Sequence, residues 1–238
     1  MSAILLKREF IITEDGSHTL FVPELNEHYH SIHGAIQESM HVFIQTGLNT
    51  FTDKKDISIF EVGFGTGLNA LLTLREAISQ QKNIKYTTIE KYPIRLEEIE
   101  ILNYPNALGG ELKNEFELLH NADWGSFSNI DLNKNKTGEA TFNLKKVHLD
   151  LRNFAPENTF DLIYFDAFSP NVQPELWSEE VFNTMYQCLN VGGILVTYSA
   201  KGFVKRNLRS AGFLVKRLPG PLGKREMLRA SKFSVGSR

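Results

Sequence analysis

Strand-like and helix-like runs divide the first fifty residues. Residues 8–13 and 18–22 are strand-like runs of largely apolar side chains, and the turn pair Asp15-Gly16 lies between them. Residues 33–46 read as a helix that is closed by Gly47. The pattern therefore predicts a β-hairpin followed by one helix.

From residue 57 onwards, short apolar runs alternate with helical patterns. The apolar runs predict strands over residues 57–62, 84–90, 141–149, 160–165, 193–198, 213–218 and 227–233. The remaining segments predict helices over residues 68–79, 94–102, 178–189 and 202–211, a short helix near 111–120 and a polar loop at 133–138. Strands that alternate with helices predict a mostly parallel sheet covered on both faces.

The last two predicted strands are joined by the short connection PGPLGKRE, residues 219–226. This connection is too short for a helical crossover, so the two strands should pair antiparallel. A doubly wound α/β sheet that ends in an antiparallel hairpin is the arrangement of Rossmann-like methyltransferases. We expect residues 1–50 to pack as a hairpin and helix on a core of residues 51–238, as one structural unit.

Composition narrows the class of protein and its compartment. The only cysteine is Cys188, so no internal disulfide can form, and its helical context indicates a small core residue. The apolar run Ile4 to Leu6 is too short for a signal peptide, and no stretch approaches the roughly 18 apolar residues of a membrane span. These features predict a cytoplasmic protein that makes no membrane contact.

Charge is unevenly distributed along the chain. Residues 199–238 contain eleven Lys and Arg but a single acid, Glu226, so they carry +10 while residues 1–198 carry −12. An acidic body suits a cationic ligand and a basic end suits a polyanion such as RNA. The alternative is that folding scatters these charges over the surface.

The strongest motif is IFEVGFGTGLNALLTL at residues 59–74, where a buried strand enters a glycine-rich loop and then an apolar helix. Glycines permit a sharp turn and a close approach of a ligand to the backbone. A dinucleotide loop of the form G-x-G-x-x-G would require glycine at Leu68, and Glu61 would repel a pyrophosphate. The acid suits the cationic amino-acid end of S-adenosylmethionine. The predicted cofactor contacts here are Glu61, Gly63, Phe64, Gly65, Thr66, Gly67, Leu68 and Asn69.

Two further acids end predicted strands. Glu90 ends the second core strand, where an acid accepts hydrogen bonds from ribose hydroxyls, unless it is a surface glutamate that begins a loop. Asp150 follows the third and is placed to receive the adenine amino group, unless it caps the next turn. Both are predicted cofactor contacts.

The segment FDAFSP at residues 165–170 carries the predicted reaction. Asp166 ends a buried strand, and the sequence after it resembles the D-P-P-Y type loop of enzymes that methylate amines. An ammonium has no lone pair, so a carboxylate that orients the acceptor amine and accepts its proton is needed. Asp166 is the predicted catalytic residue, unless it only caps the following turn. Phe168, Ser169 and Pro170 are predicted to line the acceptor slot.

Other polar residues carry weaker signals. His28, His30, His33, Glu38 and His41 lack the spacing of fixed metal ligands, so no metal is expected. Trp124 and Trp177 are interpreted as core or rim aromatics. Lys224 and Arg225 lie in a loop bounded by glycine and proline, from which they could reach a phosphate backbone.

Several of these stretches together resemble the methyltransferase domain of the bifunctional MnmC proteins, which modify the wobble uridine of tRNA. The resemblance covers residues 29–229, with matching stretches at residues 28–44, 61–69, 89–93, 165–177, 190–213 and 220–228. It implies that the loop 63–69 and Glu90 hold S-adenosylmethionine and that Tyr29 and Glu38 lie against the pocket. It also implies that Asp166 meets the acceptor amine and that Lys224 and Arg225 face tRNA.

The implied reaction converts 5-aminomethyl-(2-thio)uridine at the wobble position to its 5-methylaminomethyl form. No second glycine-rich fingerprint for FAD is present, so we expect another enzyme to supply the aminomethyl intermediate. Residues 104–140 match the family poorly. Three alternatives remain: a small-molecule amine methyltransferase or aminopropyltransferase of the same fold, an NAD-dependent dehydrogenase disfavoured by Leu68, and a non-catalytic RNA-binding module.

Overall fold

An eight-stranded sheet forms the centre of the computed structural model, which describes residues 7–132 and 140–233. The order of its strands is β10-β11-β9-β8-β4-β5-β7-β6. Their bounds are β4 (Asp56–Val62), β5 (Asn83–Glu90), β6 (Phe127–Ile130), β7 (Thr141–His148), β8 (Phe160–Phe165), β9 (Leu189–Thr197), β10 (Leu214–Pro219) and β11 (Glu226–Ser231). The predicted polar loop 133–138 lies outside the described residues.

The sheet confirms the predicted α/β class. Strands β7, β5, β4, β8 and β9 are parallel neighbours, and β11 pairs antiparallel with both β9 and β10, as the short connection predicted. At the opposite edge, β6 pairs antiparallel with β7. The carboxyl ends of five parallel strands therefore meet along one edge, where folds of this class place their ligands.

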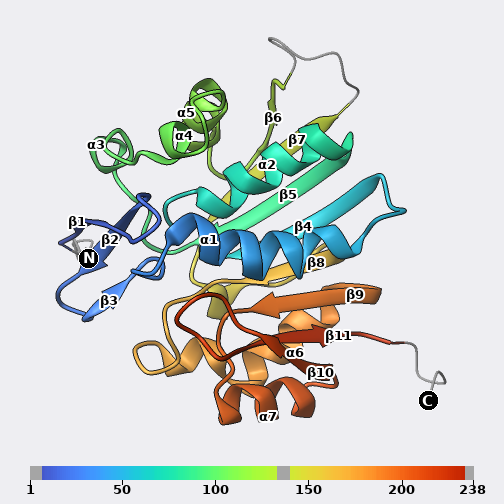
Figure 1. Ribbon diagram of the computed structural model, residues 1–238. Helices are drawn as coiled ribbons and strands as arrows, with labels where there is room; N and C mark the ends of the chain where they lie inside the picture. Colours follow the sequence, from blue (N-terminus) through green and yellow to red (C-terminus); the bar gives the residue numbers. More distant parts are fainter. Residues whose placement is uncertain (1–6, 133–139, 234–238) are drawn as a thin grey trace.

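Helices cover both faces of the sheet (Figure 1). The helices are α1 (Ala35–Ser39), a π-helix (Met40–Gln45), α2 (Leu68–Gln80), α3 (Leu96–Ile99), α4 (Tyr104–Ala107), α5 (Lys113–Asn121), α6 (Glu179–Gln187) and α7 (Gly202–Ser210), with 3-10 turns at Leu48–Thr50, Leu151–Asn153 and Pro174–Trp177. One buried apolar cluster joins the sheet to α2, α5 and the π-helix, and a second joins it to α6 and α7. Cys188 is buried in the second cluster, as predicted.

A small antiparallel sheet of β1 (Glu9–Ile12), β2 (His18–Val22) and β3 (Glu27–His28) confirms the predicted N-terminal hairpin. The backbone hydrogen bond from Gly16 to Thr13 closes its turn. None of the helices in the described ranges is long and apolar enough to cross a membrane.

Two predicted helices differ from the structure. The predicted helix 94–102 is wrong in length, because the structure has only α3, which Arg95 and Glu98 cap, and then turns back with Leu102 donating to Ile99. Its pattern misled because Leu96 and Ile101 are exposed apolar residues. The predicted helix 33–46 begins at Ala35 and widens into a π-helix, a form that periodicity does not distinguish from an α-helix.

Candidate functional site

A cavity of about 450 Å³ opens at the carboxyl edge of the parallel strands. Most predicted site residues line it, namely Tyr29, Glu38, Gly63, Phe64, Gly65, Thr66, Leu68, Asn69, Glu90, Asp150, Asp166, Phe168, Ser169 and Lys224. Four others do not, namely Glu61, Gly67, Pro170 and Arg225. The structure thus brings residues from β4, β5, β7 and β8 and from both chain ends to one place.

The glycines of the glycine-rich loop lie so close to neighbouring residues that a side chain would not fit at their positions. A Cβ on Gly63, whose φ is +86°, would lie 2.7 Å from the backbone oxygen of Asp166. A Cβ on Gly67, whose φ is +73°, would lie 2.7 Å from Nε2 of His120. Gly67 therefore shapes the loop from behind without lining the cavity. The loop requires glycine for both its backbone angles and its packing.

Carboxylates at the ends of β5 and β7 define one end of the cavity, the cofactor end. Glu90 accepts hydrogen bonds from the backbone nitrogens of Gly65 at 3.1 Å and Tyr92 at 2.7 Å, which fix it beside the glycine-rich loop. Asp150 pairs with Arg152 at 2.7 Å and Lys91 at 2.9 Å. These hydrogen bonds and charges, that of Arg152 foremost, hold the pKa of Asp150 well below its usual range. Both acids are therefore fixed acceptors.

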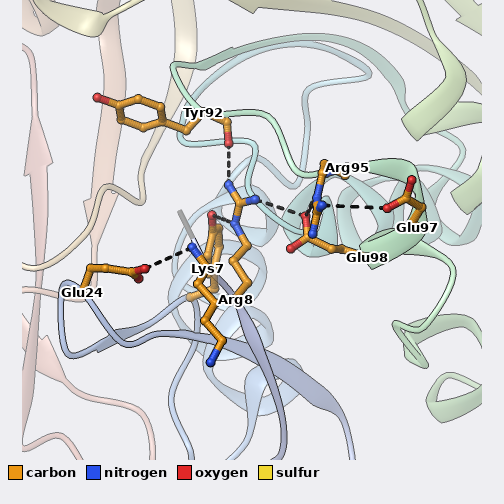
Figure 2. Close-up of polar contacts among 8 residues, drawn as sticks. Lys7, Arg8, Glu24, Tyr92, Arg95, Glu97 and Glu98 are labelled. Carbon is orange, nitrogen blue, oxygen red and sulfur yellow. Dashed lines mark hydrogen bonds and ion pairs between the residues drawn. The ribbon is translucent and has the colours of Figure 1, made fainter. Parts of the chain in front are cut away.

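Arg8 fastens the N-terminal sheet to this end of the cavity (Figure 2). Its guanidinium donates to the Tyr29 hydroxyl at 2.9 Å, to the Tyr92 carbonyl at 3.1 Å and to Glu98 at 3.1 Å. The Arg8 and Glu98 side chains are only 5% and 6% exposed. Tyr29 lies over the glycine-rich loop, since a Cβ on Gly65 would lie 3.1 Å from its ring. No sequence pattern indicated Arg8, because its partners are distant along the chain.

Glu61 is a predicted cofactor contact, but it is not among the residues that line the cavity. Its side chain is fully buried behind the glycine-rich loop, beside Asn69, Tyr86 and Thr88. Neither carboxyl oxygen makes a hydrogen bond that satisfies normal geometry. Burial raises the pKa of Glu61 well above its usual value. Its predicted contact with the cofactor stays a prediction.

Asp166 lies at the other end of the cavity, the acceptor end. It follows β8, and its Oδ2 accepts a hydrogen bond of 2.8 Å from the amide nitrogen of Asn69 in α2. Burial, with the nearby Glu38 carboxylate acting in the same direction, raises the pKa of Asp166 to about 7. A carboxyl group with this pKa can accept a proton near neutral pH and can release it again.

Three more residues complete the acceptor end. Glu38 in α1 pairs with Lys224, whose ammonium nitrogen also lies 4.1 Å from the centre of the Tyr198 ring. Tyr198 donates its hydroxyl proton to the carbonyl of Ala167 at 2.9 Å. Sequence reasoning missed Tyr198, although it follows β9 at the same edge and the rule that selected Asp166 would have found it.

Aromatic residues form one wall of the acceptor end. The Phe168 ring meets the Tyr29 ring edge-on, with centroids 5.0 Å apart, and its backbone oxygen accepts from Trp177 at 2.9 Å. Ser169 donates to Glu27 of β3. Phe168 and Ser169 therefore line the cavity as predicted, and Trp177 is a fully buried core residue.

A buried polar chain supports the cofactor end from behind, and the sequence did not indicate it. His30 contacts the Thr66 hydroxyl at 2.7 Å, and His120 contacts the Thr66 carbonyl at 3.2 Å. Lys146 donates to the His120 carbonyl at 2.6 Å. Burial lowers the pKa of His30 to about 4 and that of His120 to about 3, so both are neutral near pH 7. The two histidines therefore contact the loop without adding charge.

Histidines at the cavity do not gather into a metal site. His33 pairs with Glu14, and His41 contacts the carbonyl of Pro219. Within the part of the chain that the structure describes, no group of three or more His, Cys, Asp or Glu side chains could hold a metal ion.

Comparison with known proteins identifies the class of enzyme to which the chain belongs. A family model described as S-adenosyl-L-methionine-dependent methyltransferase matches residues 114–233, and the chain belongs to this family. S-adenosylmethionine is therefore its cofactor. The cavity fits this molecule, because its glycine-rich loop permits close backbone contact and carboxylates that can accept hydrogen bonds lie beside the loop.

Two relatives of this chain are bifunctional proteins of one kind, the MnmC proteins. The bifunctional MnmC protein of Cupriavidus metallidurans, named for tRNA 5-methylaminomethyl-2-thiouridine biosynthesis, is 32% identical over 95% of this chain and 34% of its own length. That of Campylobacter hominis is 29% identical over 89% of this chain and 31% of its own. The chain therefore spans about a third of these relatives and matches their methyltransferase part.

Comparison with solved structures supports the same family. The crystal structure of MNMC2 from Aquifex aeolicus has a TM-score of 0.74 and 27% identity, and the match covers 96% of this chain and 71% of that one. Spermidine synthase from Thermotoga maritima has a TM-score of 0.53 at 11% identity, covering 97% of this chain and 70% of that one. The second likeness shows a shared fold alone.

Proposed function

We propose that this methyltransferase methylates the amine of 5-aminomethyl-(2-thio)uridine at the wobble position of tRNA, which gives the 5-methylaminomethyl form. The observation that carries the proposal is the place of Asp166. It is a half-buried carboxyl group with a pKa of about 7, and it accepts a hydrogen bond from the Asn69 amide of α2. The names of the relatives supply the nucleoside.

The proposed chemistry assigns a task to each end of the cavity. Bound S-adenosylmethionine supplies an electrophilic methyl group on sulfur. Asp166 accepts a proton from the acceptor ammonium and orients the nitrogen lone pair. Transfer of the methyl group to the neutral amine would form the nitrogen–carbon bond as the carbon–sulfur bond breaks, and would leave S-adenosylhomocysteine and a secondary ammonium ion. That ammonium can then lose one of its two protons to water. Phe168 and Tyr198 offer apolar surfaces that suit a flat base.

The C-terminal third offers a surface for the tRNA backbone. Arg206 and Arg209 of α7 and Lys216 and Arg217 of β10 are exposed. Burial and the positive charges of Arg209 and Arg217 lower the pKa of Lys205, which shows how closely these cations gather. Such a surface supports sequence-independent contacts with phosphates. We infer that it positions the anticodon arm at the cavity.

The proposal is tested by methyl transfer from labelled S-adenosylmethionine to tRNA from cells that lack this gene, followed by nucleoside analysis. Label in a 5-methylaminomethyl wobble uridine is the expected result. Unlabelled tRNA, with cofactor binding intact, would contradict the proposal and move the acceptor to a small amine or another RNA.

A further inference from the structure

Lys224 and Arg225 are neighbours in the loop between β10 and β11, but the structure gives them different surroundings. Lys224 lines the cavity, and its side chain is 34% exposed. Arg225 is exposed and does not line the cavity. The expectation that both residues face phosphates therefore fits Arg225 and does not fit Lys224.

The Lys224 ammonium is fixed on two sides. Glu38, whose side chain is 8% exposed, accepts its hydrogen bond, and the Tyr198 ring lies beneath it. The second oxygen of Glu38 accepts from the backbone nitrogen of Ser31 at 2.7 Å, so the carboxylate cannot easily turn away. These contacts place a positive charge in the acceptor end of the cavity.

The two other cations among the described residues that line the cavity, Lys91 and Arg152, lie at the cofactor end and not at the acceptor end. Both pair with Asp150 there. The titratable groups near Lys224 are Glu38, Asp166, Tyr198 and His30, and His33 lies beside the neighbouring Gly223. Two of them are carboxyl groups, and without Lys224 both would favour a positively charged ligand.

We propose that Lys224 keeps the acceptor amine in its neutral, reactive form, because its positive charge offsets the negative charge of Glu38 and Asp166. The inference rests on the proposed function, because it takes the acceptor to be an amine. An alkylamine arrives at neutral pH mostly as an ammonium, which has no lone pair for the methyl group. A cation beside the amine disfavours the ammonium, so the proton moves to Asp166 or to water before transfer.

The test compares Lys224→Met, Lys224→Arg and Arg225→Met with the wild type across pH 6 to 10, using aminomethyl-bearing tRNA. We expect Lys224→Met to lower kcat by about tenfold or more at pH 7 and to recover at high pH, with the acid limb of its profile moved up by about one unit. Lys224→Arg should stay near the wild type, since it keeps the charge. Arg225→Met should raise KM and flatten the salt dependence of tRNA binding, without moving the profile.

Removal of Lys224 also removes a charge that lowers the pKa of Asp166, which would move the profile in the same direction. The Asp166→Asn background separates the two effects, because residue 166 no longer titrates there. Single-turnover rates in that background should still show the shift when Lys224→Met is added.

Three results would overturn the inference. Lys224→Met could behave like Arg225→Met, which would make Lys224 a phosphate contact. It could lower kcat equally at every pH without rescue by Lys224→Arg, which would make its role one of packing. The shift could vanish in the Asp166→Asn background. An inactive wild type with intact cofactor binding would instead refute the proposed function, and this inference with it.

Discussion

Two aspartates at the same edge of the sheet differ in nearly every physical respect. Asp150 follows β7 and is held as a carboxylate by Arg152 and Lys91, so its pKa is well below its usual range. Asp166 follows β8, has no cationic hydrogen-bond partner among the described residues, accepts one amide hydrogen bond and has a pKa of about 7. The fold thus uses one position in two ways. An acid paired with two cations gives a fixed contact for binding, and an acid with a raised pKa gives a group that can exchange protons.

The largest expected effect comes from Asp166→Ala. Because Asp166 is the proposed proton acceptor, we expect turnover to fall by about a hundredfold or more, the usual contribution of a positioned acid or base. Affinity for S-adenosylhomocysteine should change little. Rapid-quench methylation assays and calorimetry would measure the two quantities.

The matched variant is Asp150→Ala, which should do the reverse, weakening cofactor affinity while turnover at saturating cofactor is kept. If Asp166→Ala retained near wild-type turnover, or if the two variants behaved alike, the contrast between the aspartates would be wrong.

Arg8→Met tests the support of the cofactor end. It leaves the Tyr29 hydroxyl, the Tyr92 carbonyl and the Glu98 carboxylate without their shared donor. We expect the free energy of unfolding to fall by about 1–3 kcal/mol, and cofactor affinity to weaken with it. Urea denaturation and calorimetry measure both.

The control for this variant is Lys7→Met, because the Lys7 side chain is 69% exposed and pairs only at the surface. It should change stability by less than about 0.5 kcal/mol. Equal effects of the two variants would show that the N-terminal sheet makes no specific contribution.

The pKa of Asp166 also predicts how stability depends on pH. The folded state holds this proton up to about pH 7, while the unfolded chain releases it near the ordinary value of 3.8. The folded state therefore binds more protons between these values, and the stability contributed by Asp166 is lost as pH rises through 7. Asp166→Asn removes this loss.

We expect Asp166→Asn to gain stability relative to the wild type by on the order of 1.4 kcal/mol for each pH unit between about 4 and 7. Urea denaturation of both proteins at pH 5 and pH 8 would show this. A difference that stays constant across that range would mean that Asp166 titrates normally in the folded state.

The cations of α7 and β10 should contribute to RNA binding and should not affect catalysis in the cavity. Replacing Lys205, Arg209 and Arg217 by Gln should weaken tRNA binding by about tenfold near physiological salt and make its salt dependence shallower by roughly two in slope. Affinity for S-adenosylhomocysteine should be unchanged. Filter binding across a salt series measures the slope, and a slope equal to the wild type would exclude this surface.

The parallel core and its glycine-rich loop could be predicted because short-range patterns determine them. Apolar runs, glycine spacing and acids at strand ends placed β4, β5, β7, β8 and the site acids Glu90 and Asp166 correctly at one edge. The edge strand β6 escaped prediction because only one of its four residues is buried, so it has no strong apolar run.

Contacts between distant segments could not be predicted in the same way. Arg8 meets Glu98, and Lys224 meets Glu38, through contacts that join opposite parts of the chain. Charge counting treated the C-terminal cations as one group, but Lys224 faces the cavity and Lys232 donates to the carbonyls of Tyr186 and Leu189. Only the folded chain separates cations that face ligands from cations that stabilise the fold.

The central claim is that the cavity delivers a methyl group to an amine on a wobble uridine. The most direct measurement offers the enzyme two synthetic anticodon stem-loops, one with 5-aminomethyluridine and one with 5-hydroxymethyluridine, together with labelled S-adenosylmethionine. The account predicts label only on the aminomethyl substrate and as a 5-methylaminomethyl nucleoside. Label on both stem-loops, or on neither while the cofactor binds, would contradict it.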